Sequence, residues 1–132
     1  LKVAAVYDAG RVINPVTAKT QVEGGVVQGI SIGLLEEMKF SEQGKLLNPS
    51  YIDYKISTAA DIPDELLVDF VEVPQEDGPY GARGIGEHVM VPTPPAIANA
   101  LYHAAGIRVR TLPMTSEKVY WALKERASAS LR

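Results

Sequence analysis

The chain contains 132 residues, a length that fits one ordinary domain with a single hydrophobic core. Hydrophobic residues make up 46% of it and charged residues 22%, which is the balance of a globular protein and excludes a disordered one. The formal net charge of −3 leaves no overall positive field that could hold a nucleic-acid backbone, so we expect no nucleic-acid partner.

The content of cysteine and histidine limits the metal chemistry. No cysteine is present, which excludes disulfides, thiolate metal sites and iron–sulfur clusters from this segment. His88 and His103 are too few for a histidine-based metal site, so we predict no metal held by side chains. No apolar run reaches the roughly 18 residues of a membrane helix and no signal peptide opens the chain, which favours a cytoplasmic protein without membrane contact. Leu1 already begins a strand pattern, and we expect a piece of a longer polypeptide.

The first part of the sequence predicts a strand followed by a long helix. Residues 3–7 are largely apolar in both alternating sets, which predicts a strand buried on both faces. Asn14-Pro15 is typical of a helix start. Helix-compatible sequence continues to about Leu35, with Gly24-Gly25 as a point where the helix could break in two.

Three glycines in this predicted helix recur every four residues: Gly25, Gly29 and Gly33. They would form a bare stripe on one face of the helix. Because a helical glycine costs about 1 kcal/mol relative to alanine, the stripe must be compensated by something packed close against it. The sequence leaves two candidates open, which are another helix or sheet, or a bulky flat ligand.

Shorter elements follow in chain order: a hairpin over 36–47, a strand over 66–73, a glycine-rich loop over 74–86, a helix over 94–105 stopped by Gly106, a strand over 107–109, a helix over 116–126 and a frayed end over 127–132. In the second strand, Val68, Phe70 and Val71 are expected in the core. Thr115 or Ser116 is expected to cap the last helix. This order indicates an α+β fold, a two-layer mixed sheet with helices packed on it.

The most informative segment is Gly81-Ala82-Arg83-Gly84-Ile85-Gly86-Glu87. Its glycine spacing reverses the dinucleotide fingerprint, and no P-loop lysine follows, so a nucleotide loop is not indicated. The glycines would let backbone approach a ligand closely beside Glu87, which could act as a general base. Burial would raise the pKa of Glu87, and the charge of Arg83 could oppose that shift. The alternative is a tight turn in which Glu87 only favours the start of a helix.

A second candidate is Gln28, which lies between two glycines of the stripe. Its amide offers donors and an acceptor, so it can satisfy a ligand edge that carries carbonyl, amine and oxo groups. The alternative is an ordinary glutamine on the surface of a helix.

Four segments in register resemble the xanthine dehydrogenase and aldehyde oxidase family of molybdenum hydroxylases. They are Asp8-x-Gly10-x-x-x-Asn14-Pro15, Gln21-x-x-Gly24-Gly25-x-x-Gln28-Gly29, the stretch 48–54 that ends in Asp53-Tyr54, and Gly81-Ala82-Arg83-Gly84-x-Gly86-Glu87 followed by Pro95-Ala96-Ile97-x-Asn99-Ala100. The resemblance runs over nearly the whole chain. It departs at Arg83, where lysine is also common, and at residues 88–91, where small residues are more typical.

The resemblance implies that residues 1–132 are the C-terminal part of a molybdenum cofactor-binding domain. The metal would be held by molybdopterin, plain or as its cytosine dinucleotide, and Glu87 would take a proton from its hydroxyl ligand as that group attacks the substrate. Gln28 and the backbone at Gly84 and Gly86 would contact the cofactor. Iron–sulfur centres and FAD would lie in other domains or subunits, and the isolated segment would be inactive.

The resemblance leaves the substrate open between a purine or other N-heterocycle and an aldehyde. His88, which follows the base, could touch substrate or cap the turn, and we favour the cap. Two other functions remain as alternatives: a non-catalytic assembly module of such a complex, and an unrelated domain that binds a small anion in the glycine loop.

Overall fold

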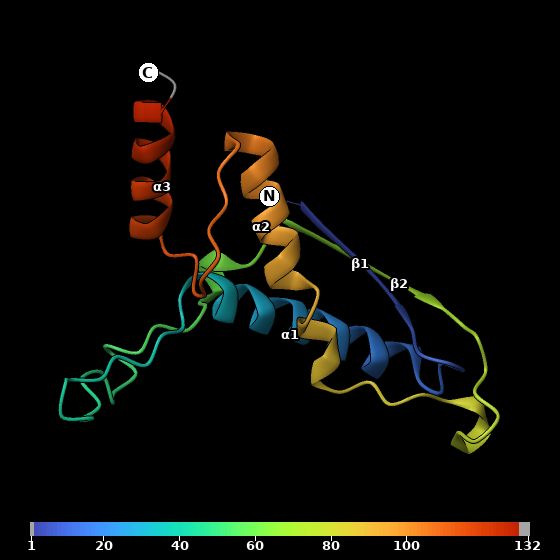
Figure 1. Cartoon of the computed structure of the whole chain (residues 1–132). Helices are drawn as coiled ribbons and strands as arrows, with labels where there is room; N and C mark the ends of the chain where they lie inside the picture. Colours follow the sequence, from blue (N-terminus) through green and yellow to red (C-terminus); the bar gives the residue numbers. More distant parts are fainter. Residues whose placement is uncertain (1, 130–132) are drawn as a thin grey trace.

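The computed structural model describes residues 2–129 of the chain (Figure 1). Its longer elements are β1 (Lys2–Asp8), α1 (Pro15–Leu34), β2 (Glu65–Val71), α2 (Thr93–Ala105) and α3 (Ser116–Ala129). Three single turns of 3₁₀ helix lie between them: η1 (Ala59–Asp61), η2 (Pro79–Gly81) and η3 (Glu87–Met90). Among these described residues, no helix has the length and apolar character needed to cross a membrane.

The two strands pair in parallel, in a register that runs from Lys2 opposite Glu65 to Asp8 opposite Val71. Parallel neighbours need a long crossover, and α1 lies in the connection between them. The predicted α+β class is confirmed. The sheet, which was expected to be mixed, is a parallel pair in the part of the chain that the structure describes.

Within the described residues, only one face of this sheet is covered, by α1 (Figure 1). The prediction that residues 3–7 are buried on both faces is therefore wrong: Val3, Ala5 and Tyr7 pack on the core, whereas Val6 is 60% exposed. Val71, predicted in the core, is 50% exposed for the same reason, because it follows the inward-facing Phe70 by one residue. Val68 and Phe70 pack against the core as predicted.

Helix α1 begins where the sequence predicts. The side chain of Asn14 accepts hydrogen bonds from the backbone N–H groups of Val16 and Thr17, at 3.1 and 3.2 Å, and Pro15 occupies the first helical position. The helix continues unbroken through Gly24-Gly25, so the suggested break does not occur. Its buried face forms the core together with Val89, through Val22, Val26 and Ile30.

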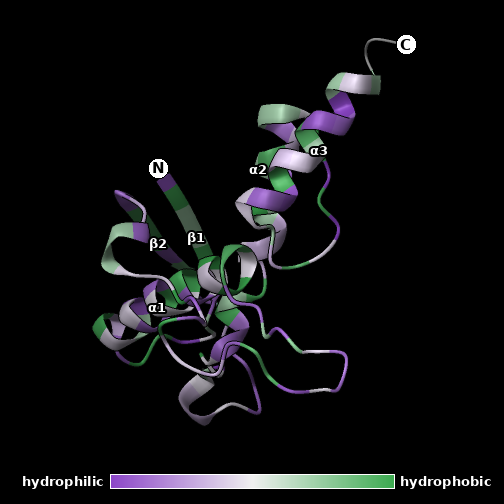
Figure 2. Ribbon diagram, turned by 90° about the vertical axis from the view of Figure 1, so that its left-hand side faces the viewer, coloured by the Kyte–Doolittle hydropathy of each residue, from purple (hydrophilic) through white to green (hydrophobic). Residues whose placement is uncertain are grey.

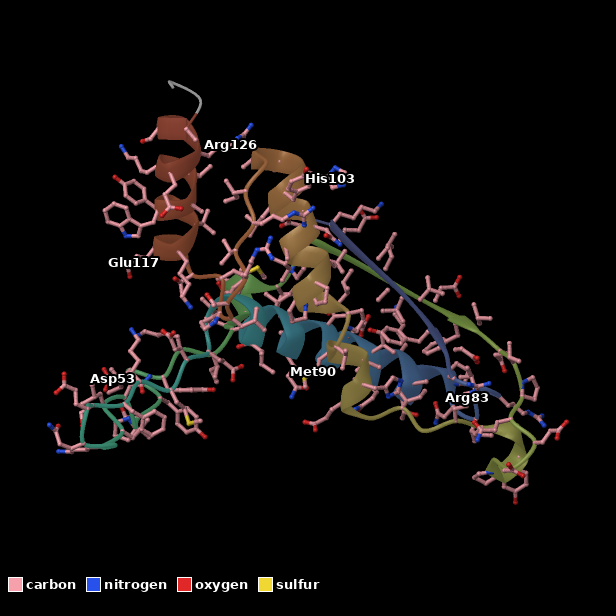
Figure 3. All side chains as sticks on the ribbon, viewed as in Figure 1. Asp53, Arg83, Met90, His103, Glu117 and Arg126 are labelled. Carbon is pink, nitrogen blue, oxygen red and sulfur yellow. The ribbon has the colours of Figure 1, made fainter. Side chains whose placement is uncertain are left out.

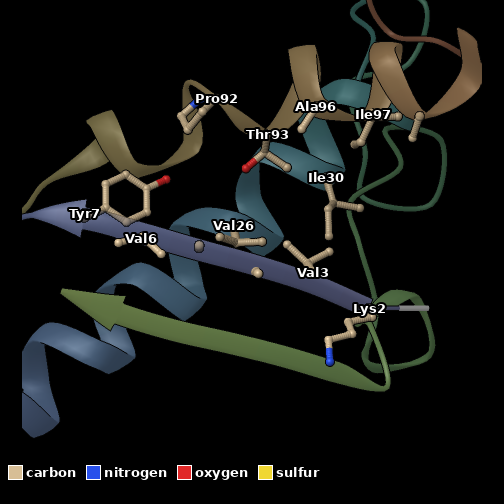
Figure 4. Close-up of a pocket in the computed structure, with 13 residues that line it drawn as sticks. Lys2, Val3, Val6, Tyr7, Val26, Ile30, Pro92, Thr93, Ala96 and Ile97 are labelled. Atoms are coloured by element: carbon tan, nitrogen blue, oxygen red, sulfur yellow. The ribbon is translucent and has the colours of Figure 1, made fainter. Parts of the chain in front are cut away.

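Helix α2 crosses α1 and ends at Gly106, whose φ of 61° lies in the left-handed region that glycine adopts without strain. Between β1, α1 and α2 lies a largely apolar groove of about 440 Å³, bordered by Val3, Val26 and Ile97 (Figure 4). The groove separates the outer edge of β1 from α2, and in the described residues β1 pairs with β2 alone.

Helix α3 stands away from the sheet, and none of its described residues is buried (Figure 1). It mixes polar and apolar residues along its length (Figure 2). The Thr115 hydroxyl accepts a hydrogen bond from the backbone N–H of Lys118, so Thr115 is the cap. The helix runs to Ala129, past its predicted end at 126. Of the predicted frayed end, residues 127–129 are helical and 130–132 lie outside the described residues.

Two predicted strand elements do not form. The hairpin over 36–47 is reduced to one bridge between Phe40 and Leu46 around its predicted turn, and residues 107–109 form no strand. The turn itself is closed by the hydrogen bond from Ser41 N–H to the Lys45 carbonyl at 2.9 Å. This segment projects from the rest of the chain (Figure 1), and Phe40 is 56% exposed. A two-stranded ribbon without a covered face has little to stabilise it.

Candidate functional site

The glycine stripe of α1 is a notch that receives η3 and the start of α2. A Cβ atom built on Gly25 would overlap the side chain of Val89, approaching its Cβ to 3.0 Å. On Gly29 it would come within 2.6 Å of the Thr93 Cβ, and on Gly33 within 3.4 Å of Ile97 Cδ1. The sequence left open whether a helix or sheet, or a bulky flat ligand, packs against the glycine stripe. In the structure, helical segments η3 and α2 pack against it.

Turn η3 is held from two sides. The side chain of Val89 is fully buried in the notch at Gly25. On the other side, the hydroxyl of Tyr7 on β1 donates a hydrogen bond to the Val89 carbonyl. The Tyr7 ring also meets the His88 ring edge to face, with centroids 6.0 Å apart. Glu87 is the first residue of this turn, so its position follows from how the turn is seated.

The side chains of the two predicted site residues, Gln28 on α1 and Glu87 on η3, are in contact. Gln28 lies one helical turn after Gly25, and its Nε2 donates a hydrogen bond to Oε1 of Glu87 at 3.2 Å, although the residues are 59 apart in the sequence. Gln28 is half-buried and Glu87 is exposed. The burial that we expected around Glu87 is thus not found among the described residues.

Arg83, whose charge was considered as one influence on Glu87, pairs with Asp8. Its Nη2 lies 3.5 Å from Asp8 Oδ2, where β1 ends (Figure 3). The Asp8 carboxylate also accepts hydrogen bonds from the N–H groups of Gly10 at 2.9 Å and Val73 at 3.3 Å. These hydrogen bonds, led by that from Gly10 and helped by the charge of Arg83, lower the pKa of Asp8 below its usual value.

The same corner anchors the glycine loop. The N–H of Arg11 donates to the Gly81 carbonyl at 2.8 Å, and the N–H of Arg83 donates to the Ala9 carbonyl at 2.9 Å. Gly10 has a φ of 61°, and a Cβ there would lie 2.9 Å from the Arg83 nitrogen, so only glycine fits. Sequence reasoning singled out the Asp8-x-Gly10 turn as a motif but did not connect it with Arg83.

The predicted cofactor glycines differ from those of the notch. A Cβ atom on Gly84 or on Gly86 would meet no described atom within 4 Å. Their φ values are not in the left-handed region, and no packing contact within the described chain requires glycine at either position. His88 accepts a long hydrogen bond, 3.4 Å, from the Gly86 N–H through Nδ1 at the start of η3. The bare backbone here is free for close approach by a ligand.

These features suit an organic cofactor better than an ion bound by side chains. Residues 2–129 contain no group of three histidine, cysteine, aspartate or glutamate side chains that could hold a metal ion. A glutamine amide, a carboxylate and open glycine backbone can instead satisfy a flat ligand with many polar edge atoms.

Comparison with known proteins agrees with this chemistry. Residues 1–63 match the model of a family described as molybdopterin cofactor-binding domain. The chain is 38% identical over 120 residues to the putative xanthine dehydrogenase molybdenum-binding subunit of Escherichia coli, covering 90% of this chain and 16% of that protein. It is 36% identical over 119 residues to the aldehyde oxidoreductase molybdenum-binding subunit of the same organism, covering 89% and 16%.

The fold gives the same result. The crystal structure of quinoline 2-oxidoreductase from Pseudomonas putida matches with a TM-score of 0.83 and 33% identity, over 92% of this chain and 16% of that one. The aldehyde oxidoreductase of Desulfovibrio gigas matches with a TM-score of 0.81 and 32% identity, over 93% and 14%. The chain thus spans about a sixth of the length of these relatives. By sequence and by fold, it belongs to the molybdenum hydroxylase family.

Proposed function

We propose that this chain forms part of the cofactor cleft of an oxidoreductase that hydroxylates a carbon of a purine, another N-heterocycle or an aldehyde with oxygen derived from water. When bound, the molybdenum–molybdopterin cofactor supplies the two-electron redox chemistry. The relatives' names cover xanthine, aldehyde, nicotine and quinoline enzymes, so the proposed substrate class stays equally broad.

In this proposal Glu87 is the general base. It accepts the proton from the water-derived hydroxyl as the carbon–oxygen bond forms and the carbon–hydrogen bond breaks, with the two electrons of that bond passing to the bound cofactor. Accepting this proton is a task for a positioned carboxylate with access to the reacting group. The observation that carries the proposal is the 3.2 Å hydrogen bond that joins Gln28 to Glu87, because it brings the amide and the carboxylate to one place from two distant segments.

Gln28 has capacity for a second role. Its amide has two N–H donors and a carbonyl acceptor, and the contact with Glu87 uses one donor. The remaining donor and the carbonyl can bind polar edge atoms of the pterin or of the metal's ligands. The backbone at Gly84 and Gly86, open where a Cβ would stand, can approach the cofactor within van der Waals distance.

Catalysis in this scheme belongs to an assembly. A sequence without cysteine cannot carry an iron–sulfur cluster, so electrons leave through iron–sulfur and flavin groups of other domains or subunits. Several relatives are named as subunits, which supports this arrangement. The other wall of the cofactor cleft must also come from outside residues 1–132, and the segment alone is expected to be inactive.

The test replaces Glu87 in the assembled, molybdenum-loaded enzyme. We expect Glu87→Gln to lower the hydroxylation rate about 100-fold or more, the loss typical of a missing general base, at unchanged molybdenum content. The control is Glu76→Gln. Glu76 is an exposed carboxylate in the loop before Gly81, and this variant should keep the wild-type rate. An unchanged rate in Glu87→Gln would leave Glu87 as a turn residue and favour a non-catalytic module.

A further inference from the structure

We infer that Tyr7 is a positioning residue for Glu87, acting through the backbone of η3. This inference rests on the proposed function, because it assigns Tyr7 a part in presenting the proposed base. Tyr7 belongs to β1 and lies 82 residues before Val89, whose carbonyl accepts the hydrogen bond from its hydroxyl. In Figure 4 the Tyr7 ring stands off β1 on the side of the turn that leads into α2.

Two side chains from other elements hydrogen-bond to η3 within the described residues. Gln28 binds the carboxylate of Glu87 at the first position of the turn, and Tyr7 binds the carbonyl of Val89 at the third. The turn has only four residues, so it cannot hold its own geometry as a longer helix would. Its orientation therefore depends on these outside contacts and on the buried side chain of Val89.

Val89 connects η3 both to α1 and to β1. Its side chain fills the notch at Gly25, and its carbonyl is tied to Tyr7 on the sheet. The notch fixes how far the turn stands from α1, and the Tyr7 hydroxyl restrains the turn against sliding or rotating in the notch. Since the Gln28–Glu87 hydrogen bond already spans 3.2 Å, a displacement of about 1 Å would exceed hydrogen-bonding distance.

The Tyr7 hydroxyl remains protonated, so it can donate its hydrogen bond to the Val89 carbonyl continuously. Burial raises the pKa of Tyr7 above its ordinary value of 10.0, so the hydroxyl keeps its proton and remains a donor near neutral pH. The ring contact with His88 does not need the hydroxyl. Tyr7→Phe therefore removes the tie to Val89 and leaves the ring packing in place.

A matched control exists within the chain. The hydroxyl of Tyr54 also donates a tertiary hydrogen bond, to Oε2 of Glu36 at 2.7 Å, and it lies outside η3 and the glycine loop. Tyr54→Phe deletes the same atom from a comparable contact. A general loss of stability would follow from either variant, whereas a loss of positioning would follow from Tyr7→Phe alone.

The experiment measures turnover in the assembled, cofactor-loaded enzyme. We expect Tyr7→Phe to lower kcat roughly 10- to 100-fold with little change in KM or molybdenum content, since misplacing a catalytic group by about 1 Å costs up to that factor. Tyr54→Phe should retain kcat. In a Glu87→Gln background, Tyr7→Phe should have no further effect on kcat, because residues that act through one group are not additive.

A second readout does not depend on turnover. Hydrogen exchange of the full protein, followed by mass spectrometry, should be faster in residues 86–91 of Tyr7→Phe and unchanged there in Tyr54→Phe. The positioning role would be overturned if Tyr7→Phe kept the wild-type kcat and the wild-type exchange rates. It would also be overturned if Tyr7→Phe lowered kcat by the same factor in the Glu87→Gln background as in the wild type. If instead Glu87→Gln alone leaves the rate unchanged, it is the proposed function that fails, and the exchange result still decides whether Tyr7 holds the turn.

Discussion

Replacing Gly25 with alanine tests whether the α1 notch is what seats η3. The new Cβ would overlap Val89 Cγ2 and lie 3.0 Å from Val89 Cβ and 3.5 Å from the backbone nitrogen of Met90. Val89 is fully buried and β-branched, so it has little freedom to turn away. The added methyl must push the turn off the helix.

Gly24→Ala is the reference against which the destabilisation by Gly25→Ala is measured. A Cβ on Gly24 meets nothing within 4 Å. Both substitutions gain the same helix propensity, roughly 0.5–1 kcal/mol, because they lie side by side in the interior of α1. This gain cancels when the variants are compared, and the difference between them is the overpacking term, about 1–3 kcal/mol.

Hydrogen exchange of the full protein is the suitable assay, because it reports local opening of α1 without requiring two-state unfolding of a large enzyme. We expect amides of α1 near residue 25 to be less protected in Gly25→Ala than in Gly24→Ala, by roughly 5- to 150-fold for about 1–3 kcal/mol. Equal protection in the two variants, or greater protection in Gly25→Ala, would refute the packing described here.

Two further predictions concern the segments around this site. Because the folded-state pKa of Asp8 is depressed by its hydrogen bonds from Gly10 and Val73 and by Arg83, its contribution to stability is present above the ordinary pKa of 3.8 and is lost as pH falls through the folded value. Exchange protection around Gly10 should therefore hold at pH 6 to 8 and weaken below about pH 4, and in Asp8→Asn it should lose this pH dependence. Asn14→Ala should destabilise the start of α1 by about 1 kcal/mol while Asn14→Asp should not, as judged by exchange in residues 16–20; equal behaviour of the two variants would contradict the cap.

Local signals were sufficient to predict where α1 begins and where α2 ends. Asn14-Pro15 begins α1 and Gly106 ends α2 at the predicted residues, because a capping side chain and a left-handed glycine act through near neighbours in the chain. The candidate pair Gln28 and Glu87 was also found in the sequence, through the glycines that flank each residue and the resemblance of their segments. That the two side chains meet could not be predicted, since 59 residues separate them.

Features that depend on neighbouring surfaces were predicted less well. An apolar pattern such as that of residues 3–7 shows that a strand can be buried, but not which elements cover it; here α1 covers one face, and Val6 is exposed. The burial considered for Glu87 is absent for a similar reason, because no described element covers this side chain. The ion pair between Arg83 and Asp8 was not predicted, because the two residues are close in space and distant in sequence.

The central claim is that Gln28 and Glu87 face the molybdenum cofactor, and its most direct test is to locate the metal. Anomalous X-ray scattering at the molybdenum edge, from crystals of the assembled enzyme, would do so without reference to activity. We predict a single peak beside the Gln28–Glu87 pair, on the side where the backbone of Gly84 and Gly86 is open. A molybdenum peak away from this pair, with Glu87 out of reach of any ligand of the metal, would contradict the assignment of the site.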